Sequence, residues 1–231
     1  MRDIINIRIK AVYEFAAEHY KILLIFTMPI ACIYHLLLLI VGGPLDILTF
    51  NFTTLIQIFL GFLFIGSLMT VMIYLVDNLT HKRKIDSEEL KHFTKQHIII
   101  ITGSIFLVIL LTNIGFLLLI IPGIIAFTRL ASVPFLIGID KVKLFHSIDL
   151  SFEYSKNYTW QMFFCLLIIT FIQFNVRTIL AFLQLDLGGF IGTIIDAIVY
   201  IIEIILVYHF YQDIRKDMLA ALYKQPPPLL Q

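Results

Sequence analysis

Charge is scarce in this chain, and its scarcity indicates the class of protein. Only 14% of the 231 residues are charged, whereas 60% are hydrophobic and the mean hydropathy is +0.95. Soluble domains average about 25% charged and about 45–50% apolar residues. A water-soluble protein of this length could not bury so much apolar surface, but a membrane solvates it. The net charge of +1 gives no indication of a nucleic-acid partner.

The common catalytic and metal-binding motifs are also missing from the sequence. There is no phosphate-binding loop ending in Gly-Lys-Ser/Thr, no His-Glu-x-x-His, no Cys-x-x-Cys and no Gly-x-Ser-x-Gly. The two cysteines, Cys32 and Cys165, stand alone within apolar runs, which argues against a disulfide framework. We therefore expect a protein that is not an enzyme and that has no metal site and no cofactor.

Long apolar runs are what the chain does contain. A membrane span needs about 20 apolar residues, because the hydrocarbon core is about 30 Å thick and a helix rises about 1.5 Å per residue. A helix also pairs its backbone groups internally, as the membrane requires. The six predicted spans cover approximately residues 22–41, 52–76, 98–117, 120–139, 162–185 and 187–211.

The predicted fold class is therefore an all-α integral membrane protein with six transmembrane helices. Residues 1–224 form a single membrane domain, and the proline-rich tail at 225–231 is expected to be disordered because proline cannot continue a helix. The third and fourth spans share one nearly uncharged stretch. Its turn lies at Asn113–Gly115 or at Pro122–Gly123, and the sequence leaves both positions open.

Basic residues predict the orientation of the spans. Fifteen of the 17 lysines and arginines lie in the N-terminal segment, the C-terminal segment and the two connections on the same predicted side. The three connections on the other side contain none. Because loops rich in lysine and arginine stay in the cytoplasm, both termini are predicted to be cytoplasmic.

A short amphipathic stretch precedes each predicted hairpin of spans. Such stretches surround Val12 before the first span, Phe93 before the third and Ile148 before the fifth, and they are typical of helices that lie flat in the headgroup region. The pattern suggests three helix-hairpin units. The alternative is that the three stretches resemble one another without being a repeat, because every span needs polar and aromatic residues where it enters the membrane.

Four ionisable residues fall within the predicted spans, where each costs at least about 2.5 kcal/mol at the bilayer centre unless it is paired or hydrated. Counting residues from the turns predicts an ion pair between Arg177 and Asp196, and a second between Arg129 and Glu203 if spans four and six touch. These pairs either hold helices together or line a polar cavity for an anionic group, a lipid headgroup or a proton path. Further polar residues that could line such a cavity are Asn113, Gln173, Asn175 and His35.

Small residues mark one face of the sixth span. Gly188, Gly192 and Asp196 follow one another at intervals of four residues. Small side chains at this spacing let a second helix approach closely. The pattern predicts that Gly188 and Gly192 belong to a helix-packing face.

The stretch from Leu118 to Trp160 carries a resemblance. Its marks are Pro122-Gly123 between apolar runs, then Pro134 and an acidic residue at Asp140, and finally serines at Ser147 and Ser151 in an amphipathic segment. It resembles the YciC-like family of bacterial inner-membrane proteins, and it is similar to the membrane domain attached to some glycerophosphodiester phosphodiesterases. The resemblance implies a six-helix protein of the bacterial inner membrane without an assigned reaction.

The chain also departs from this family. Asp149 and Glu153 stand where relatives usually carry basic residues, which speaks against a phosphate-binding role for this segment. No phosphodiesterase domain is present in the sequence, so that activity does not carry over.

Taken together, these features predict a non-catalytic protein that organises membrane lipids or partner proteins in the bacterial envelope. The alternative is a small transporter or channel for a lipid-related or ionic substrate. Membrane lipids are the expected partners, whereas the protein partners, the oligomeric state and the substrate of a transporter do not follow from the sequence. Hydration of the intramembrane polar residues distinguishes the two hypotheses.

Overall fold

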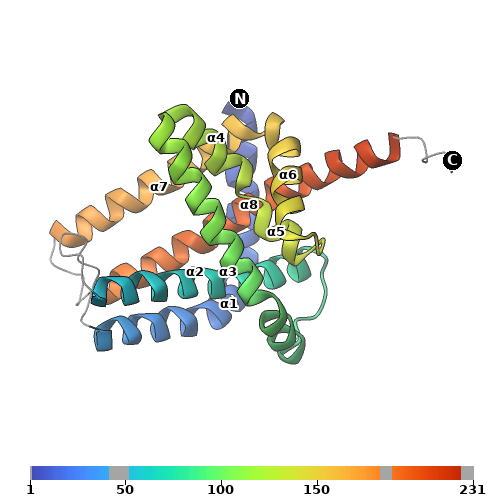
Figure 1. The fold of residues 1–231 in the computed structure, drawn as a ribbon. Helices are drawn as coiled ribbons and strands as arrows, with labels where there is room; N and C mark the ends of the chain where they lie inside the picture. Colours follow the sequence, from blue (N-terminus) through green and yellow to red (C-terminus); the bar gives the residue numbers. More distant parts are fainter. Residues whose placement is uncertain (1, 42–51, 183–188, 225–231) are drawn as a thin grey trace.

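The computed structural model describes residues 2–41, 52–182 and 189–224, and all regular structure in these ranges is helical (Figure 1). Six segments are long and apolar enough to cross a membrane, with α4 and α5 together forming the fourth. This confirms the predicted fold class. The helices are α1 (Arg2–Val41), α2 (Phe52–Thr80), α3 (Ser87–Leu118), α4 (Ile120–Leu130), α5 (Val133–Gly138), α6 (Leu144–Tyr154), the short 3-10 helix η1 (Ser155–Asn157), α7 (Thr159–Phe182) and α8 (Phe190–Lys224). The proline-rich tail at 225–231 lies outside the described residues.

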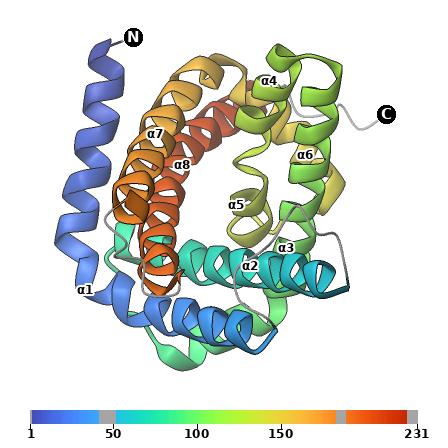
Figure 2. The ribbon, with the colours of Figure 1, turned by 90° about the vertical axis from the view of Figure 1, so that its left-hand side faces the viewer.

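Helix α1 continues from its amphipathic first half into the first span, but it bends on the way. Figure 2 shows the first half beside α7 and the second half turning to run beside α2. Pro29 lies within the helix and cannot donate a backbone hydrogen bond. The hydroxyl of Thr27 donates to the carbonyl of Leu23 at 2.6 Å. A hydroxyl that bonds back to its own helix in this way often bends the helix, so it adds to the effect of Pro29.

The expected interfacial helices are separate in only one of three places. The stretches before the first and third spans are continuous with α1 and α3, whereas α6 is a helix of its own before α7. Helix α3 begins ahead of its amphipathic stretch, which therefore belongs to the same helix as the span. Asp86 accepts a hydrogen bond from the backbone N–H of Glu88 at 2.9 Å, and acidic residues in the first turn suit a helix N-terminus. All three amphipathic stretches are therefore helical, and only the third forms a helix of its own.

The turn between the third and fourth spans lies at Leu119, so both positions considered from the sequence were wrong. Leu119 is extended (φ −165°, ψ 156°) between the end of α3 and the start of α4. Pro122 belongs to the first turn of α4, where a missing backbone N–H leaves no helical bond unmade. Gly115 and Gly123 lie opposite each other across the hairpin, which lets the two helices approach closely.

The fourth span is broken. Helix α4 ends at Leu130, Ala131 and Ser132 form a turn, and α5 begins at Val133. All six residues of α5 are buried, so this short helix lies in the middle of the bundle. It packs against α2, α3 and α6. The span predicted over 120–139 is thus present as Ile120–Gly138, but two helices form it.

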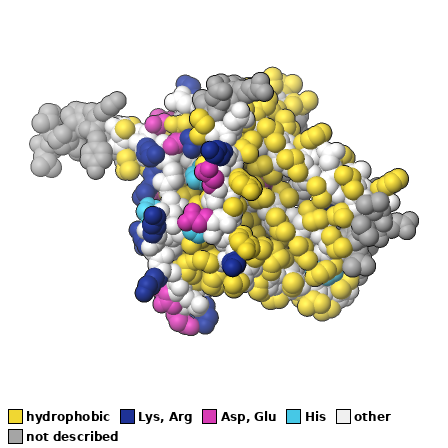
Figure 3. All heavy atoms as spheres, turned by 180° about the vertical axis from the view of Figure 1, so that it is seen from behind, with side chains coloured by type: hydrophobic (Ala, Val, Ile, Leu, Met, Phe, Trp, Pro, Cys, Tyr) yellow, Lys and Arg dark blue, Asp and Glu magenta, His cyan; other side chains and the backbone are white. Residues whose placement is uncertain are grey.

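Charged and apolar side chains separate on the surface. Figure 3 shows lysine, arginine, aspartate and glutamate gathered towards one side of the visible face, while apolar side chains cover most of the remainder. The exposed side chains of α3 and α7 include large apolar residues such as Leu117, Phe171 and Phe174. Such a belt suits contact with lipid chains, since lipid is as apolar as these side chains.

The hairpin of α3 and α4 yields a first prediction. A methyl group at Gly115 would lie 2.9 Å from the Cα of Gly123 and 3.1 Å from the carbonyl oxygen of Pro122, which are backbone atoms that cannot move aside cheaply. We expect Gly115→Ala to lower the stability by about 1–3 kcal/mol. Thermal unfolding in detergent measures the change.

Gly103 provides the matched control on the same helix, because no atom lies within 4 Å of a methyl group placed there. Gly103→Ala should keep or slightly raise the unfolding temperature, since alanine favours a helix. Equal losses in the two variants would contradict the close approach of α3 and α4.

Candidate functional site

Two groups of polar contacts involve the arginines of the membrane-spanning helices. The first joins α7 and α8 around Arg177 and Asp196. The second surrounds the break between α4 and α5 and contains Arg129. Glu203 belongs to neither group.

The expected ion pair between α7 and α8 is present. Nη1 of Arg177 lies 3.3 Å from Oδ2 of Asp196, and the side-chain amide of Gln173 donates to Oδ1 of Asp196 at 2.8 Å. The side chains of Arg177 and Asp196 are 40% and 38% exposed, so packing encloses the pair only in part. Both carboxylate oxygens of Asp196 therefore accept a hydrogen bond, one from Arg177 and the other from Gln173.

Gly192 lies directly beside this pair. A methyl group there would approach the guanidinium of Arg177 to 2.9 Å. The glycine thus makes room for the arginine side chain that reaches from α7. Gly188, the other residue of the predicted packing face, lies outside the described residues.

Two of the polar residues considered as cavity lining face elsewhere. Asn113 and Asn175 are exposed, and each side-chain amide donates to a carbonyl four residues earlier in its own helix, at 2.8 and 2.7 Å. His35 lies nearer to α8, with Nδ1 3.3 Å from the hydroxyl of Thr193. Asn113 is therefore not part of the polar cluster, because its amide group is bound to its own helix.

Arg129 and Glu203 do not form the second pair: among the ion pairs of the described residues, none joins them. The Nε of Arg129 donates to the hydroxyl of Thr159 at 3.1 Å, and its guanidinium lies 4.8 Å from the ring centroid of Phe152. That pair was expected only if spans four and six touch, and the contacts of Arg129 lie instead with α6 and α7.

Serine hydroxyls satisfy the broken end of α4. The carbonyl of Arg129 accepts from the hydroxyl of Ser151 at 2.5 Å and from that of Ser155 at 3.2 Å. The hydroxyl of Ser132, in the turn itself, lies 2.7 Å from that of Ser151. All three serines are fully buried. Backbone groups freed at a helix break inside a membrane protein need such partners.

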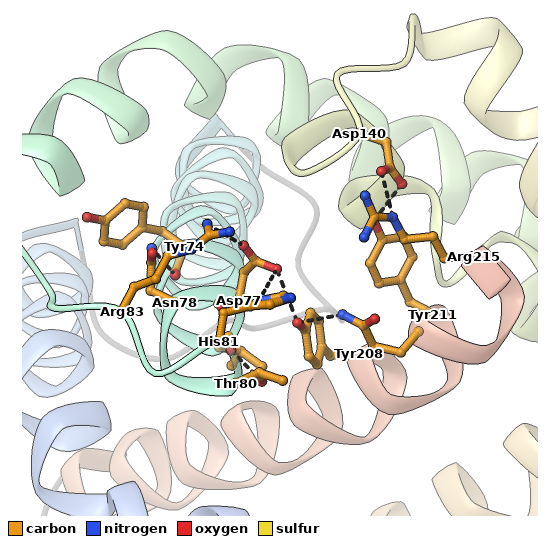
Figure 4. Close-up of polar contacts among 12 residues, drawn as sticks. Tyr74, Asp77, Asn78, Thr80, His81, Arg83, Asp140, Tyr208, Tyr211 and Arg215 are labelled. Carbon is orange, nitrogen blue, oxygen red and sulfur yellow. Dashed lines mark hydrogen bonds and ion pairs between the residues drawn. The ribbon is translucent and has the colours of Figure 1, made fainter. Parts of the chain in front are cut away.

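Hydrogen bonds join Asp140, in the turn that follows α5, to α8. Asp140 accepts from the hydroxyl of Tyr211 at 2.5 Å and from Nε of Arg215 at 2.8 Å (Figure 4). One turn earlier on α8, the hydroxyl of Tyr208 donates to Asp77 of α2 at 3.1 Å. Helix α8 therefore binds two elements through residues on one face.

Further polar contacts tie the same end of α8 to α1 and to the start of α7. Arg8 pairs with Asp213, and the hydroxyl of Tyr158 donates to Asp217 at 2.9 Å. Burial and this hydrogen bond raise the pKa of Tyr158 to about 12, so its hydroxyl remains a donor at neutral pH.

The sequence analysis did not predict the contacts of α8 with Asp77 and Asp140. Tyr208, Tyr211 and Arg215 follow at intervals of three and four residues, which places them on one helix face. That spacing was a usable signal for a common partner. Asp77 and Asp140 lie near span ends, where charged residues are ordinary, so nothing in their positions indicated that both meet α8.

The described residues offer no cluster of three or more histidine, cysteine, aspartate or glutamate side chains that could hold a metal ion. In comparisons with known proteins, no family model, no curated protein and no solved structure matches the chain. The resemblance to the YciC-like family therefore stays a prediction from residues 118–160.

The serine cluster yields a second prediction. Ser151→Ala removes the shorter hydrogen bond to the carbonyl of Arg129 and leaves the hydroxyl of Ser132 without that partner. We expect a loss of about 1–3 kcal/mol, because buried polar groups lose their partners. Denaturation in detergent measures it.

Ser147 provides the control. It is equally buried on the same helix, but its hydroxyl donates only to Leu144 in the preceding turn, at 2.6 Å. Ser147→Ala should therefore cost much less than Ser151→Ala. A similar cost for both would show that the contact with the broken helix adds little.

Proposed function

We propose that this polytopic membrane protein organises membrane lipids in a bacterial inner membrane without catalysing a reaction. The observation that carries the proposal is an apolar groove of about 320 Å³ between the first half of α1, α7 and α8. Its lining consists of apolar side chains and one tyrosine, Tyr13.

The groove suits a lipid acyl chain. Ile9 and Tyr13 of α1 and Ile168 and Ile172 of α7 line it and are at the same time exposed on the surface. In a membrane these side chains face lipid, so a chain enters the groove sideways without crossing water. Among the described residues of the lining, only the hydroxyl of Tyr13 offers a polar ligand a side-chain hydrogen bond, and unpaired polar groups are costly in such a place.

A small transporter remains the second candidate function, and one observation favours it. The break between α4 and α5 borders a separate cavity, because Leu130, Ala131 and Pro134 all line that cavity. Substrate sites in transporters are often built at discontinuous helices.

The lipid proposal is tested by narrowing the groove. Ala16→Phe places a ring in its lining, since Ala16 contributes to the groove wall. Excluding only two methylene groups of an acyl chain costs about 1.6 kcal/mol, or roughly tenfold in affinity. Native mass spectrometry of the protein released from detergent should then show about tenfold less retained phospholipid.

Ala17→Phe is the matched control, because Ala17 is exposed on the neighbouring position of the same helix and does not line the groove. It should leave lipid retention as in the parent protein. If both variants keep their lipid, the groove does not hold an acyl chain.

The orientation is tested with reporter fusions. With cytoplasmic termini, green fluorescent protein fused after Ala221 should fluoresce in a bacterial host, and alkaline phosphatase fused there should be inactive. A phosphatase fusion after Val41, at the end of α1, should be active. The reverse pattern would overturn the proposed orientation.

A further inference from the structure

Glu203 borders a cavity of about 210 Å³ that α8 forms with α2, α3, α4, α5 and α7. Among the described residues that line this cavity, Glu203 is the only charged one, and Tyr200 is the only other with a polar side-chain group. All others are apolar. Among the described lining residues, one acidic residue therefore borders a space that is otherwise apolar.

No base compensates this carboxyl group. None of the ion pairs among the described residues includes Glu203, and Arg129, its expected partner, binds Thr159 and stacks on Phe152. Within the described part of the chain, Tyr200 of α8 is the one other titratable side chain that lines the cavity, since α2, α3, α4, α5 and α7 contribute only apolar residues to the lining.

The cavity reaches the lipid-facing surface. Ile109 of α3 and Phe127 of α4 line it and are 37% and 43% exposed. Glu203 itself is half-buried. A molecule dissolved in the membrane thus reaches the carboxyl group between two apolar side chains.

We infer that this cavity is a binding site for a small lipophilic cation, which exchanges for a proton on Glu203. An ionised carboxylate without a partner is costly inside a membrane. A proton or a bound organic cation neutralises it. When the cation enters, the carboxylic acid releases its proton to the aqueous phase, and the resulting carboxylate faces the positive charge of the ligand.

The size and the chemistry of the cavity select this class of ligand. An apolar cavity of about 150 Å³ holds benzene, so a space of about 210 Å³ accommodates a single ring with a small cationic group. A metal cation such as Ca²⁺ needs about six to eight oxygen ligands. The carboxyl group and one tyrosine hydroxyl in the lining cannot supply them.

This inference is independent of the acyl-chain groove. Tyr200, Glu203 and Val207 face the cavity, whereas Val199, Ile202 and Leu206 face the groove. At 3.6 residues per turn these two sets lie on different faces of α8. Failure of one proposal therefore leaves the other standing.

The test measures the binding of radiolabelled benzyltrimethylammonium to the full chain in lipid nanodiscs. This ion keeps its charge at every pH, so only the protein titrates. Below the pH at which the carboxyl group ionises, the affinity should rise about tenfold per pH unit, because the competent fraction grows by that factor. Neopentylbenzene, its neutral isostere, should bind with the same affinity at every pH.

Glu203→Gln should abolish the pH-dependent binding while keeping the shape of the side chain. Asp196→Asn, on the same helix but outside the cavity lining, should leave it unchanged. In the unmodified chain, the lipophilic reagent dicyclohexylcarbodiimide should attach to Glu203, and benzyltrimethylammonium should slow this reaction. Peptide mass spectrometry locates the modified residue.

Two results would overturn the inference. One is pH-independent binding of the cation in the unmodified chain. The other is a cation that neither binds nor slows modification of Glu203. Both measurements use the unmodified chain, so they decide the matter even if a variant fails to fold.

Discussion

The carbonyl of Arg129 lies in the last turn of α4, at the break in the fourth span, and needs a hydrogen-bond donor there. The hydroxyls of Ser151 and Ser155 donate to it. Because these donors come from α6 and η1, that part of the chain must lie against the break. The same contact places Thr159, the first residue of α7, beside Arg129. The break in the fourth span thus determines how the chain enters the fifth.

Helix α8 packs against α1, α2, α6 and α7. Its charged end binds α5 through Asp140 and α2 through Asp77, and Arg8 of α1 pairs with Asp213 nearby. Tyrosine hydroxyls make two of these contacts, which combine an apolar ring with a polar tip. These contacts join the C-terminal half of α8 to neighbouring helices. They help to fix the helix positions that form the cavity beside Glu203 and the groove beside α1.

The intramembrane acids of α8 have opposite surroundings. Asp196 has a guanidinium and an amide donor, whereas Glu203 lies in the lining of an apolar cavity and belongs to none of the ion pairs among the described residues. A paired carboxylate holds helices together, while an uncompensated one favours binding a proton or a cation. The structural role considered for these charges fits Asp196, whereas the binding role proposed above belongs to Glu203 on the same helix.

The sequence by itself determined the membrane class, the six spans and the pair of Arg177 with Asp196. Hydropathy depends on the residue types, and the depth of a residue in a span depends on its distance along the chain from the turn. Only the tertiary structure decided where Arg129 points, that the fourth span is broken, and that Asp77 and Asp140 meet α8. These features depend on which helix faces lie together. A sequence shows which residues share a helix face, as for Tyr208, Tyr211 and Arg215, but packing between helices decides what that face meets.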